Sequence, residues 1–409
     1  MSQPFHWKSK KLGELGEISG GGTPSTKNSE YWGGEIQWIV PSEVTKTNSL
    51  YVSASERSVT EVGLASCVAR LLPAGTVMMT SRATIGEVVI NTVPMATNQG
   101  FINIVCDERL VYNEFLALWI KKHKPLFEGR AHGVTFKEIT KSNFKTIPIF
   151  LPPLPEQRAI ARALRALQEA REARRSALQL ERERKAALMQ HLFTHGTRGE
   201  ARKQTEIGEM PESWEIVTFA ESVEITKGQV NPAQEPYLSL PHVGPENIEP
   251  EMGRLLPVKT NRELKISSGN YFFTKDDVLY SKIRPYLNKV ALPDFEGTCS
   301  ADMYPLRSLD GFFAREFLFY SLLSEHFKTR AMSFQNRTGI PKINRDQLAN
   351  IPLAKPPIAE QREISYLLQA CDLKLTALEK ESALLAELFR AMLEELMTGR
   401  LSTLPLIED

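Results

Sequence analysis

The chain has 409 residues, which is more than one ordinary hydrophobic core holds, so we expect two or more domains. Its residues are 42% hydrophobic and 24% charged, and no apolar run approaches the ~18 residues of a membrane span, which excludes an integral membrane protein and predicts a soluble globular chain. The net charge of +1 neither requires nor excludes a polyanionic partner, because acidic surface elsewhere can balance a basic face.

The first residues, MSQPFHWKSKK, lack the apolar stretch of a signal peptide, which predicts a cytoplasmic protein. The cysteines include no C-x-x-C pair, a pattern that fits a reducing compartment and indicates no structural zinc site. We therefore expect packing residues at Cys67, Cys106, Cys299 and Cys371.

Strand-like runs and a helical stretch follow one another in the first 150 residues. The runs cover 76–81, 87–91 and 101–105, and the helical stretch lies at 115–122. A counterpart of that helical stretch lies at 317–327. The mixture predicts an α/β or α+β domain in each half of the chain.

A Gly/Ser/Thr-rich stretch begins at Gly16 and includes Lys27, a candidate DNA-binding residue. A phosphate cradle is one interpretation of such a loop, but the stretch has no G-x-x-x-x-G-K-[ST] pattern, and no G-x-G-x-x-G follows a clear strand. A plain turn is the favoured interpretation.

Two segments of the first half carry further candidate DNA-binding residues. VMMTSRATIGEV supplies Arg82 and Thr84, and GRAHGVTFKEI supplies Arg130 and Lys137. Basic side chains bind phosphates and guanine edges, and a small hydroxyl can reach either. Solvated surface charge explains the same composition equally well.

A segment that begins TIPIFLPPLPEQRAIARAL at Thr146 returns 204 positions later as NIPLAKPPIAEQREISYLL at Asn350. Upstream, WKSKKLGE from Trp7 resembles WEIVTFAE from Trp214. The chain therefore reads as two tandem modules, each with a variable front and a well-matched tail.

Each tail is free of Gly and Pro, from Glu156 to His195 and from Ile358 to Thr398, and so predicts a long helix. In the second tail, apolar residues recur at alternating spacings of four and three, as in a coiled coil with one polar position. That seam consists of Ile364, Leu368, Cys371, Leu375, Leu378, Ser382, Leu385, Phe389, Met392 and Leu396.

The first tail keeps this seam only at its ends, at Ile160, Leu164, Leu167, Leu188 and Leu192. In its middle the equivalent positions are charged, so the seam either shifts onto neighbouring residues or stays partly open. The charged residues are Arg171, Arg174, Glu181 and Lys185, and the neighbouring set is Ala170, Ala173, Ala177 and Leu180.

The two predicted helices carry opposite charge. Residues 156–193 hold nine Lys/Arg and five Asp/Glu, a balance of +4, whereas residues 360–397 hold four and eight, a balance of −4. This favours pairing of the helices with each other, and chain connectivity then makes them antiparallel. The alternative is that each helix is solvated and lies on its own domain.

The second module has its own candidate DNA-binding residues, within VLYSKIRPYLNKV and QNRTGIPKI. In the first of these segments basic residues interleave with tyrosines, which suits a DNA-facing ridge. The candidates are Lys282, Arg284, Tyr286, Lys289, Arg337 and Lys342.

The sequence shows no recognisable catalytic motif. A DNA amino-methyltransferase would contain N-P-P-[FYW] or D-P-P-[FYW], but Asn231-Pro232 is followed by alanine. His191 and His195 lack the glutamate of a zinc hydrolase helix. We predict no catalytic residue and no metal ligand.

Two tandem modules, each with W-x-x-x-x-[LF]-x-E near its start and IP-x-x-x-PP-x-x-EQR before a long helix, resemble the specificity subunits of type I restriction-modification systems. The phrases GGTPSTKNSEYWGGEIQWIVPSEV and ATNQGF also look like the first target-recognition domain of that family. The resemblance covers essentially the whole chain.

The resemblance implies two tandem α/β (α+β) target-recognition domains joined by two long helices, which form an antiparallel, pseudo-twofold coiled coil. The implied domains are target-recognition domain 1 at 1–150, a central spacer helix at 151–198, target-recognition domain 2 at 199–355, and a C-terminal spacer helix with a tail at 356–409. Helix residues expected in pairing or partner binding are Ile160, Leu164, Leu188, Ile364, Leu368, Leu375, Leu385 and Phe389.

The resemblance also implies a non-catalytic subunit that serves in defence against foreign DNA. Each target-recognition domain would read one half of a bipartite, asymmetric DNA site, and the helices would set the spacer and dock two modification (methyltransferase) subunits. We expect no cofactor on this chain, because S-adenosylmethionine belongs to the methyltransferase partners, and ATP and Mg to the restriction (translocase and endonuclease) partners.

Two rival hypotheses stay open. One is a stand-alone DNA-binding scaffold or regulator without methyltransferase partners, which co-purification with a methyltransferase would exclude. The other is a self-sufficient enzyme with unrecognised motifs, which methyl transfer or cleavage by the isolated chain would reveal.

Overall fold

The computed structural model describes residues 6–47, 49–132, 137–334 and 341–402. The chain divides into two compact units, and each unit takes part of both long helices. Unit 1 consists of Met1–Arg175 with Lys380–Asp409, and unit 2 is Ser176–Glu379. Each unit has a large hydrophobic core of its own.

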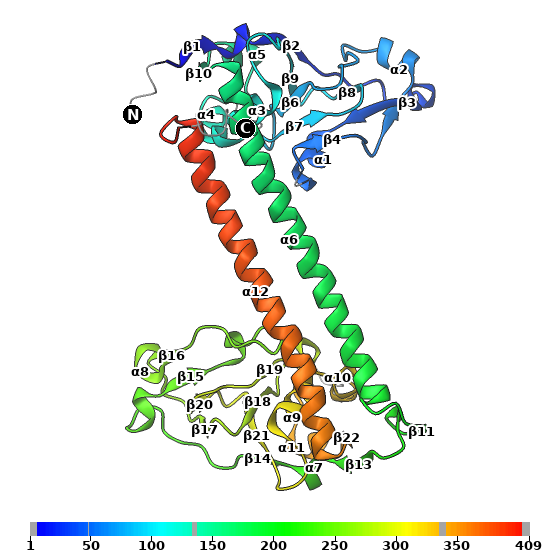
Figure 1. The fold of residues 1–409 in the computed structure, drawn as a ribbon, viewed down its shortest axis with the longest axis vertical. Helices are drawn as coiled ribbons and strands as arrows, with labels where there is room; N and C mark the ends of the chain where they lie inside the picture. The colour runs from blue at the N-terminus through cyan, green and yellow to red at the C-terminus, as the bar shows by residue number, and fades with distance from the viewer. Residues whose placement is uncertain (1–5, 48, 133–136, 335–340, 403–409) are drawn as a thin grey trace. The chain divides into compact units, whose positions relative to one another are not determined.

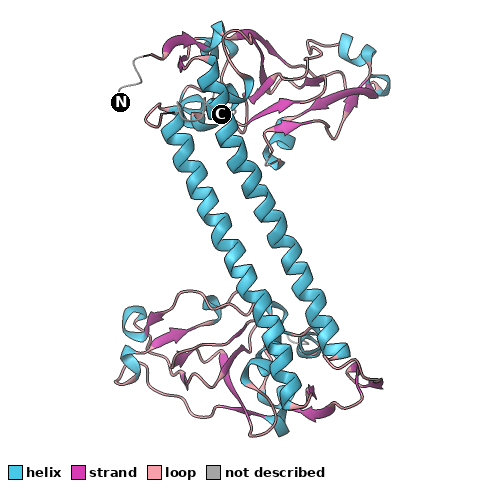
Figure 2. Ribbon diagram, in the orientation of Figure 1, coloured by secondary structure: helices cyan, strands magenta, loops and turns pink. Residues whose placement is uncertain are grey.

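Unit 1 contains ten strands among its described residues (Figures 1 and 2). They are β1 (Lys8–Lys11), β2 (Gly16–Gly20), β3 (Trp32–Ile39), β4 (Tyr51–Val52), β5 (Ser58–Val59), β6 (Val77–Thr80), β7 (Val88–Asn91), β8 (Met95–Thr97), β9 (Phe101–Cys106) and β10 (Pro148–Leu151). One sheet has the order β2-β9-β6-β7-β4, another has the order β5-β3-β8, and β1 pairs with β10. Pairing is antiparallel except between β4 and β7 and between β3 and β8.

Among its described residues, unit 1 contains five short α-helices and part of each long helix. They are α1 (Pro41–Lys46), α2 (Glu61–Ala65), α3 (Asn113–Lys122), α4 (Lys124–Gly129), α5 (Lys141–Lys145), the first part of α6 (Leu154–His195) and the last part of α12 (Ile358–Met397). Helix α3 packs on β6 and β7 of the larger sheet, and α2 packs on β3 of the smaller one. Strand β6 shows why the sheet sits between two layers. Its Val77 and Met79 join the core that contains α3, whereas Met78 joins a second cluster with Ile39 of the smaller sheet.

Unit 2 has a similar arrangement of strands. They are β11 (Arg202–Thr205), β12 (Gly208–Pro211), β13 (Glu215–Thr218), β14 (Val223–Ile225), β15 (Pro241–Val243), β16 (Lys259–Thr260), β17 (Tyr271–Phe273), β18 (Val278–Ser281), β19 (Val290–Ala291), β20 (Gly297–Cys299), β21 (Met303–Ser308) and β22 (Pro352–Lys355). The sheets have the orders β14-β21-β18-β19 and β16-β15-β20-β17, and β13 pairs with β22 as β1 pairs with β10. The shorter helices are α7 (Phe219–Ser222), α8 (Asn261–Leu264), α9 (Arg315–Leu323), α10 (Glu325–Met332) and α11 (Arg345–Ala349).

The predicted strands and long helices are confirmed, with two corrections. The glycine-rich stretch expected as a turn begins as strand β2, because Gly16–Gly20 pairs with β9 along its whole length. The helical stretch expected at 317–327 is two helices, since Ser324 ends α9 and its hydroxyl caps α10 by accepting from the Phe327 N–H.

The repeated EQR motif has the same buried role at the start of each long helix. In unit 1, Gln157 accepts the backbone N–H of Tyr112 (2.8 Å) and donates to the carbonyls of Leu110 (3.1 Å) and Pro152 (2.9 Å). In unit 2, Gln361 makes the same three bonds, with Ala314 N–H and the carbonyls of Phe312 and Pro356, at 2.7, 2.8 and 2.9 Å. The amide therefore joins the segment before α3 or α9 to the start of the long helix.

The glutamate of the same motif binds the tryptophan that opens each module. The Trp7 indole N–H donates to Glu156 (3.3 Å), and the Trp214 indole N–H donates to Glu360 (3.1 Å). The two parts of the sequence repeat, W-x-x-x-x-[LF]-x-E and EQR, are thus brought together by one buried hydrogen bond in each unit.

Helices α6 and α12 run antiparallel within each unit. In unit 1, Arg174 pairs with Glu381 (2.5 Å), and Arg171 lies over the ring of Phe389, further along α12. In unit 2, Glu181 pairs with Lys374 (2.8 Å) and Lys185 with Asp372 (2.5 Å). In both cases, a step forward along one helix is a step back along the other.

In the second half of the charged stretch of α6, the charged residues stay in the seam, while in the first half Arg171 is half-buried and Arg174 is exposed. Glu181 is only 4% exposed and Lys185 9%, whereas Leu180 of the neighbouring set is 67% exposed. Each of these buried charges has an opposite charge on α12. The polar positions thereby favour one alignment of the two helices, because a shifted register would bury a charge without its partner.

Within the described part of the chain, the four cysteines are free, no helix is long and apolar enough to span a membrane, and no group of three metal-ligating side chains occurs.

Replacing Gln157 by alanine should lower the free energy of unfolding by about 2–3 kcal/mol, because one backbone N–H and two carbonyls lose their buried partner. Urea unfolding followed by tryptophan fluorescence measures the loss. Gln190→Ala, a glutamine on the exposed side of α6, is the matched control and should change stability by less than about 0.5 kcal/mol. Equal unfolding midpoints for the two variants would show that the Gln157 amide does not hold the unit together.

Candidate nucleic-acid interface

The turn between β6 and β7 is the predicted DNA-facing segment of unit 1. It is held between two other segments, because the Ser81 N–H donates to the Gly100 carbonyl (2.7 Å) and the Ile139 N–H donates to the Ser81 carbonyl (3.1 Å). Ala83 in this turn has a φ of 58°, in the left-handed region. The side chains of the turn therefore project from a fixed backbone.

Arg82 and Thr84 both lie on this turn, but their polar groups are already engaged or covered. The Arg82 Nε lies 2.9 Å from Glu138 Oε2. The Thr84 hydroxyl is buried, with no hydrogen-bond partner among the described residues. Glu138 therefore balances the charge of Arg82, although the Arg82 side chain is 43% exposed.

The turn between β18 and β19 is the equivalent segment of unit 2. The Lys282 N–H donates to the Asp302 carbonyl (3.0 Å), and the Ile343 N–H donates to the Lys282 carbonyl (2.9 Å), as in unit 1. With this alignment, the basic residues of the two turns stand at different positions. The equivalent pairs are Ser81 and Lys282, Arg82 and Ile283, and Ala83 and Arg284.

Three predicted lysines of unit 2 bind groups of their own unit. Lys282 and Lys289 each donate an ammonium N–H to a backbone carbonyl, and burial lowers the pKa of Lys289. The Lys342 Nζ lies 3.3 Å from Asp302 Oδ1. These lysines thus have protein partners in this structure.

The other candidates in the described part of the chain are exposed, and their side chains form no ion pair with described residues. They are Lys27, Arg130 and Lys137 in unit 1 and Arg284 and Tyr286 in unit 2. Arg337 lies outside the described residues. Arg284 lies on the turn itself, and because it is exposed while Lys282 and Lys289 bind backbone carbonyls, it is the basic residue most available on that turn.

The helix residues expected in pairing or partner binding are mostly interior. Ile160, Leu164, Ile364, Leu368, Leu375 and Phe389 are buried, and Leu188 and Leu385 are half-buried. The large apolar residues that α6 and α12 expose are different ones, namely Leu180, Ile358, Tyr366, Leu367, Leu373, Leu384 and Leu388.

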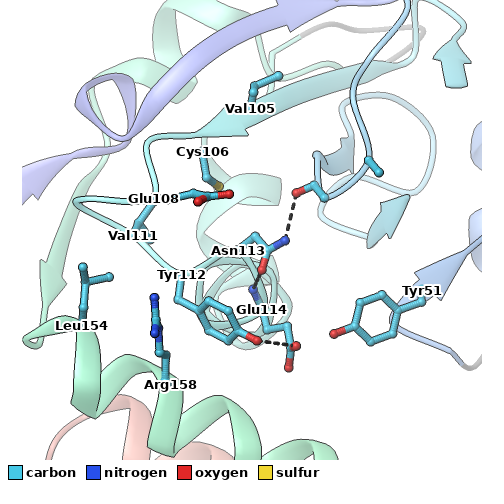
Figure 3. A pocket seen from close by; sticks show the side chains of 12 residues that line it. Tyr51, Val105, Cys106, Glu108, Val111, Tyr112, Asn113, Glu114, Leu154 and Arg158 are labelled. Carbon is cyan, nitrogen blue, oxygen red and sulfur yellow. Dashed lines mark hydrogen bonds between the residues drawn. The ribbon is translucent and has the colours of Figure 1, made fainter. Parts of the chain in front are cut away.

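A pocket of about 390 Å³ lies in unit 1 beside the start of α6 (Figure 3). Its most buried polar group is the Glu114 carboxylate, which accepts from the Tyr112 hydroxyl and from Arg165 of α6, both at 2.7 Å. Cys106 also lines the pocket, and burial raises the pKa of its thiol to about 12. A neutral thiol and an ion-paired carboxylate favour a structural tie between α3 and α6 over a reactive site.

A stacked arginine is the feature that the sequence analysis missed. The Arg57 guanidinium lies 3.6 Å from the centroid of the Trp32 ring and 5.3 Å from that of Trp38. The signal available in the sequence was a pair of tryptophans six residues apart, but strand alternation does not bring them together. Their rings meet at 5.0 Å because the register of β3 against β5 shifts between Trp32 and Ile36. Nothing local connected them to an arginine 19 positions further on.

The family model and the similar proteins described below all point to the same protein family. The family model described as "Type I restriction modification DNA specificity domain" matches the chain twice, over residues 4–182 and 211–388. The chain is 34% identical over 244 residues to the MjaIX type I restriction enzyme specificity subunit of Methanocaldococcus jannaschii, a match that covers 57% of this chain and 55% of that protein. It is 29% identical over 284 residues to the EcoDI specificity subunit of Escherichia coli, covering 64% and 63%. The matches therefore span a little over half the length of these two relatives.

Solved structures resemble the chain over nearly its full length. The S subunit of a type I restriction-modification system from M. genitalium has a TM-score of 0.59 at 14% identity, covering 95% of this chain and 96% of that one. A chain solved for complex assembly and conformational transition of the type I R-M system also has a TM-score of 0.59, at 19% identity, covering 98% and 100%. At such identities the likeness shows the fold alone.

Arg284→Ala should weaken DNA binding by about 1–3 kcal/mol if the side chain contacts a base, or flatten the salt dependence by about one charge if it contacts a phosphate. Arg82→Ala should have a smaller effect, because Glu138 already balances that charge. Binding titrations on half-site variants at several salt concentrations measure both effects. Arg262→Ala, an exposed arginine paired with Glu235 in unit 2, serves as the control. If Arg284→Ala behaves like that control, the turn is not part of the interface.

Proposed function

Because the chain belongs to the family of type I restriction-modification DNA specificity domains, we propose that it is the DNA-recognition subunit of a type I restriction-modification complex. Each unit reads one half of a bipartite DNA site. The paired helices separate the two half-sites and carry the docking surface for partner subunits.

The observation that supports this proposal is that the two units share one fold but have different polar side chains at equivalent positions of their turns. The same two backbone bonds hold the turn after β6 and the turn after β18. At the tip, unit 1 has Ala83 where unit 2 has Arg284. Equivalent positions with unlike side chains favour recognition of unlike base sequences, so the site is asymmetric.

Two methyltransferase subunits, and further restriction subunits, are the proposed protein partners. Support comes from the apolar side chains that α6 and α12 expose, of which Tyr366 and Leu373 are the most accessible. A groove of about 800 Å³ in unit 2, lined on α6 by Met189 and Phe193, offers a further apolar surface. Both features suit a partner that packs along the helices.

The chain is proposed to be non-catalytic and to bind no cofactor of its own. S-adenosylmethionine would belong to the methyltransferase partners, and ATP and Mg to the restriction partners. Support is the lack of a methyltransferase motif in the sequence, where Asn231-Pro232 is followed by alanine. Co-expression with a candidate methyltransferase tests this division, because methylation should require both chains and neither alone.

Exchanging residues 1–150 for the corresponding segment of a relative should change one half of the methylated sequence and leave the other half intact. The reason is that each half-site is read locally, since each unit has its own core and its own polar turn. Methylome sequencing of a host that carries the hybrid reads both halves at once. Alteration of both halves would contradict independent recognition by the two units.

Lengthening both helices together should change the gap between the half-sites. Four residues inserted between Arg175 and Ser176 and four between Glu379 and Lys380 add ~6 Å to each helix and rotate the remainder of that helix by ~40° beyond a full turn. Two DNA base pairs correspond to ~7 Å and ~70°. The preferred gap should therefore shift by about one or two base pairs, measured as methylation of a library in which only the gap varies.

The insertion in α6 alone is the matched control. It should impair assembly, because the contacts that α6 makes with α12 in unit 1 and in unit 2 cannot both be kept. Two residues in each helix should be worse, since a rotation of ~200° turns the apolar seam to the wrong face. An unchanged gap in an active complex with both four-residue insertions would mean that the helices do not set the spacing.

A further inference from the structure

Arg57 is held in one orientation by aromatic contacts. Its guanidinium stacks at 3.6 Å on the ring centroid of Trp32, which in turn packs edge to face against Trp38 at 5.0 Å. The Arg57 carbonyl accepts from the Trp38 N–H (3.0 Å) and from the Ser55 hydroxyl (2.7 Å), so the backbone is fixed as well. A guanidinium stacked in this way has lost much of its rotational freedom before any ligand arrives.

The aromatic support is anchored in the interior of unit 1. Trp38 is buried, and its indole N–H donates to the Gly22 carbonyl at 2.9 Å. The Trp32 indole N–H donates to the Ser25 carbonyl at 3.2 Å. Both rings are therefore tied to the same loop, which also carries the exposed Lys27.

Arg57 lacks a carboxylate partner among the described residues, although its side chain lies at the surface. Two other exposed arginines of unit 1 are ion-paired, Arg70 with Glu17 and Arg109 with Asp107. The face of the Arg57 guanidinium is used in stacking, while its N–H groups, which lie in the plane, form no hydrogen bond with described residues. This leaves the planar N–H donors of Arg57 without a described protein partner.

Hydrogen bonds connect this arginine to the predicted DNA-facing turn. The Gly22 N–H donates to the Thr97 carbonyl (2.9 Å), and the Gly100 carbonyl accepts from the Ser81 N–H (2.7 Å). The 97–100 loop thus lies between the loop under Arg57 and the turn that bears Arg82. Its exposed Gln99 bonds to Thr23 of the former loop. Backbone and side-chain hydrogen bonds therefore link the loop under Arg57 to the turn that bears Arg82.

We propose that Arg57 is a specificity-determining residue of unit 1 that reads a guanine in the major groove through a bidentate pair of hydrogen bonds. This inference rests on the proposed function. Guanine presents two acceptors, O6 and N7, at the spacing of two guanidinium N–H groups. The same fork also fits a phosphate, but a phosphate contact carries no base discrimination, so discrimination at one position distinguishes the two.

Unit 2 has no such group at the equivalent place. Trp38 of β3 faces Ala96 of the parallel strand β8, and the corresponding residue of β15 is His242, which faces Thr298 of β20. His242 is buried and bonds to Asn270 at 3.0 Å. Among the described residues, an arginine stacked at this place is therefore found in unit 1 and not in unit 2, and only the half-site read by unit 1 should depend on it.

The test uses the full chain co-purified with its co-expressed methyltransferase partner. Methylome sequencing first defines the two half-sites, and exchange of residues 1–150 identifies the half that unit 1 reads. Binding to every single-base variant of that half-site is then measured for the wild type, Arg57→Ala, Arg57→Lys and Arg109→Ala. The last variant removes the same charge from an arginine that is 89% exposed and ion-paired in the same unit.

Arg57→Ala should lose about 5- to 150-fold in discrimination at one G·C pair, the fold-change that corresponds to ~1–3 kcal/mol for a bidentate contact. Arg57→Lys should fail to restore it, because an ammonium lacks the fork. Arg109→Ala should leave discrimination unchanged at every position, and the second half-site should be unaffected in all variants.

Three results would overturn the inference: a unit 1 half-site without a required G·C pair, unchanged discrimination in Arg57→Ala, or an even loss of affinity that Arg57→Lys restores. The last would identify a phosphate contact instead. Failure of the proposed function has a different signature, because then the wild-type complex itself would show no sequence preference. The two outcomes cannot be confused.

Discussion

A buried side-chain amide at the start of each long helix is the interaction on which both units depend. Gln157 and Gln361 each satisfy one N–H and two carbonyls that would otherwise be buried without a partner. Since such groups are costly to leave unpaired, the segment before α3 or α9 has one position relative to the helix start. Because the sheets pack on α3 and α9, their position relative to the start of the long helix is fixed as well.

This rigid attachment lets the surface of each unit differ while the frame stays the same. The backbone hydrogen bonds of the two turns are equivalent, yet the position of Arg82 in unit 1 is occupied by Ile283 in unit 2, and that of Ala83 by Arg284. Trp38 and its stacked arginine in unit 1 correspond to a buried histidine in unit 2. A scaffold that tolerates such changes without altering its core suits a protein whose two halves recognise different sequences.

Charge has two distinct uses in the structure. In the helix pair, Glu181 and Lys185 are buried opposite Lys374 and Asp372, where they select one alignment. On the turns, Arg82 is paired with Glu138 inside unit 1, while the exposed Arg284 side chain forms no ion pair with described residues. A charged residue can therefore fix the register of the helix pair, form an ion pair within its unit, or remain exposed for a ligand, and its partner in the fold decides which.

The sequence by itself determined the elements and their order. Periodic apolar residues predicted α6 and α12, short β-type runs predicted β6, β7 and β9, and the repeat predicted two alike units, because these signals lie within a few residues of one another or recur at a fixed offset. It also indicated two turns as candidate DNA contacts, and the fold places them equivalently in the two units. The tertiary structure alone decided which cations are available there. Glu138 reaches Arg82 from 56 positions away and Trp32 supports Arg57 from another strand, and such long-range partners leave no periodic trace in the chain.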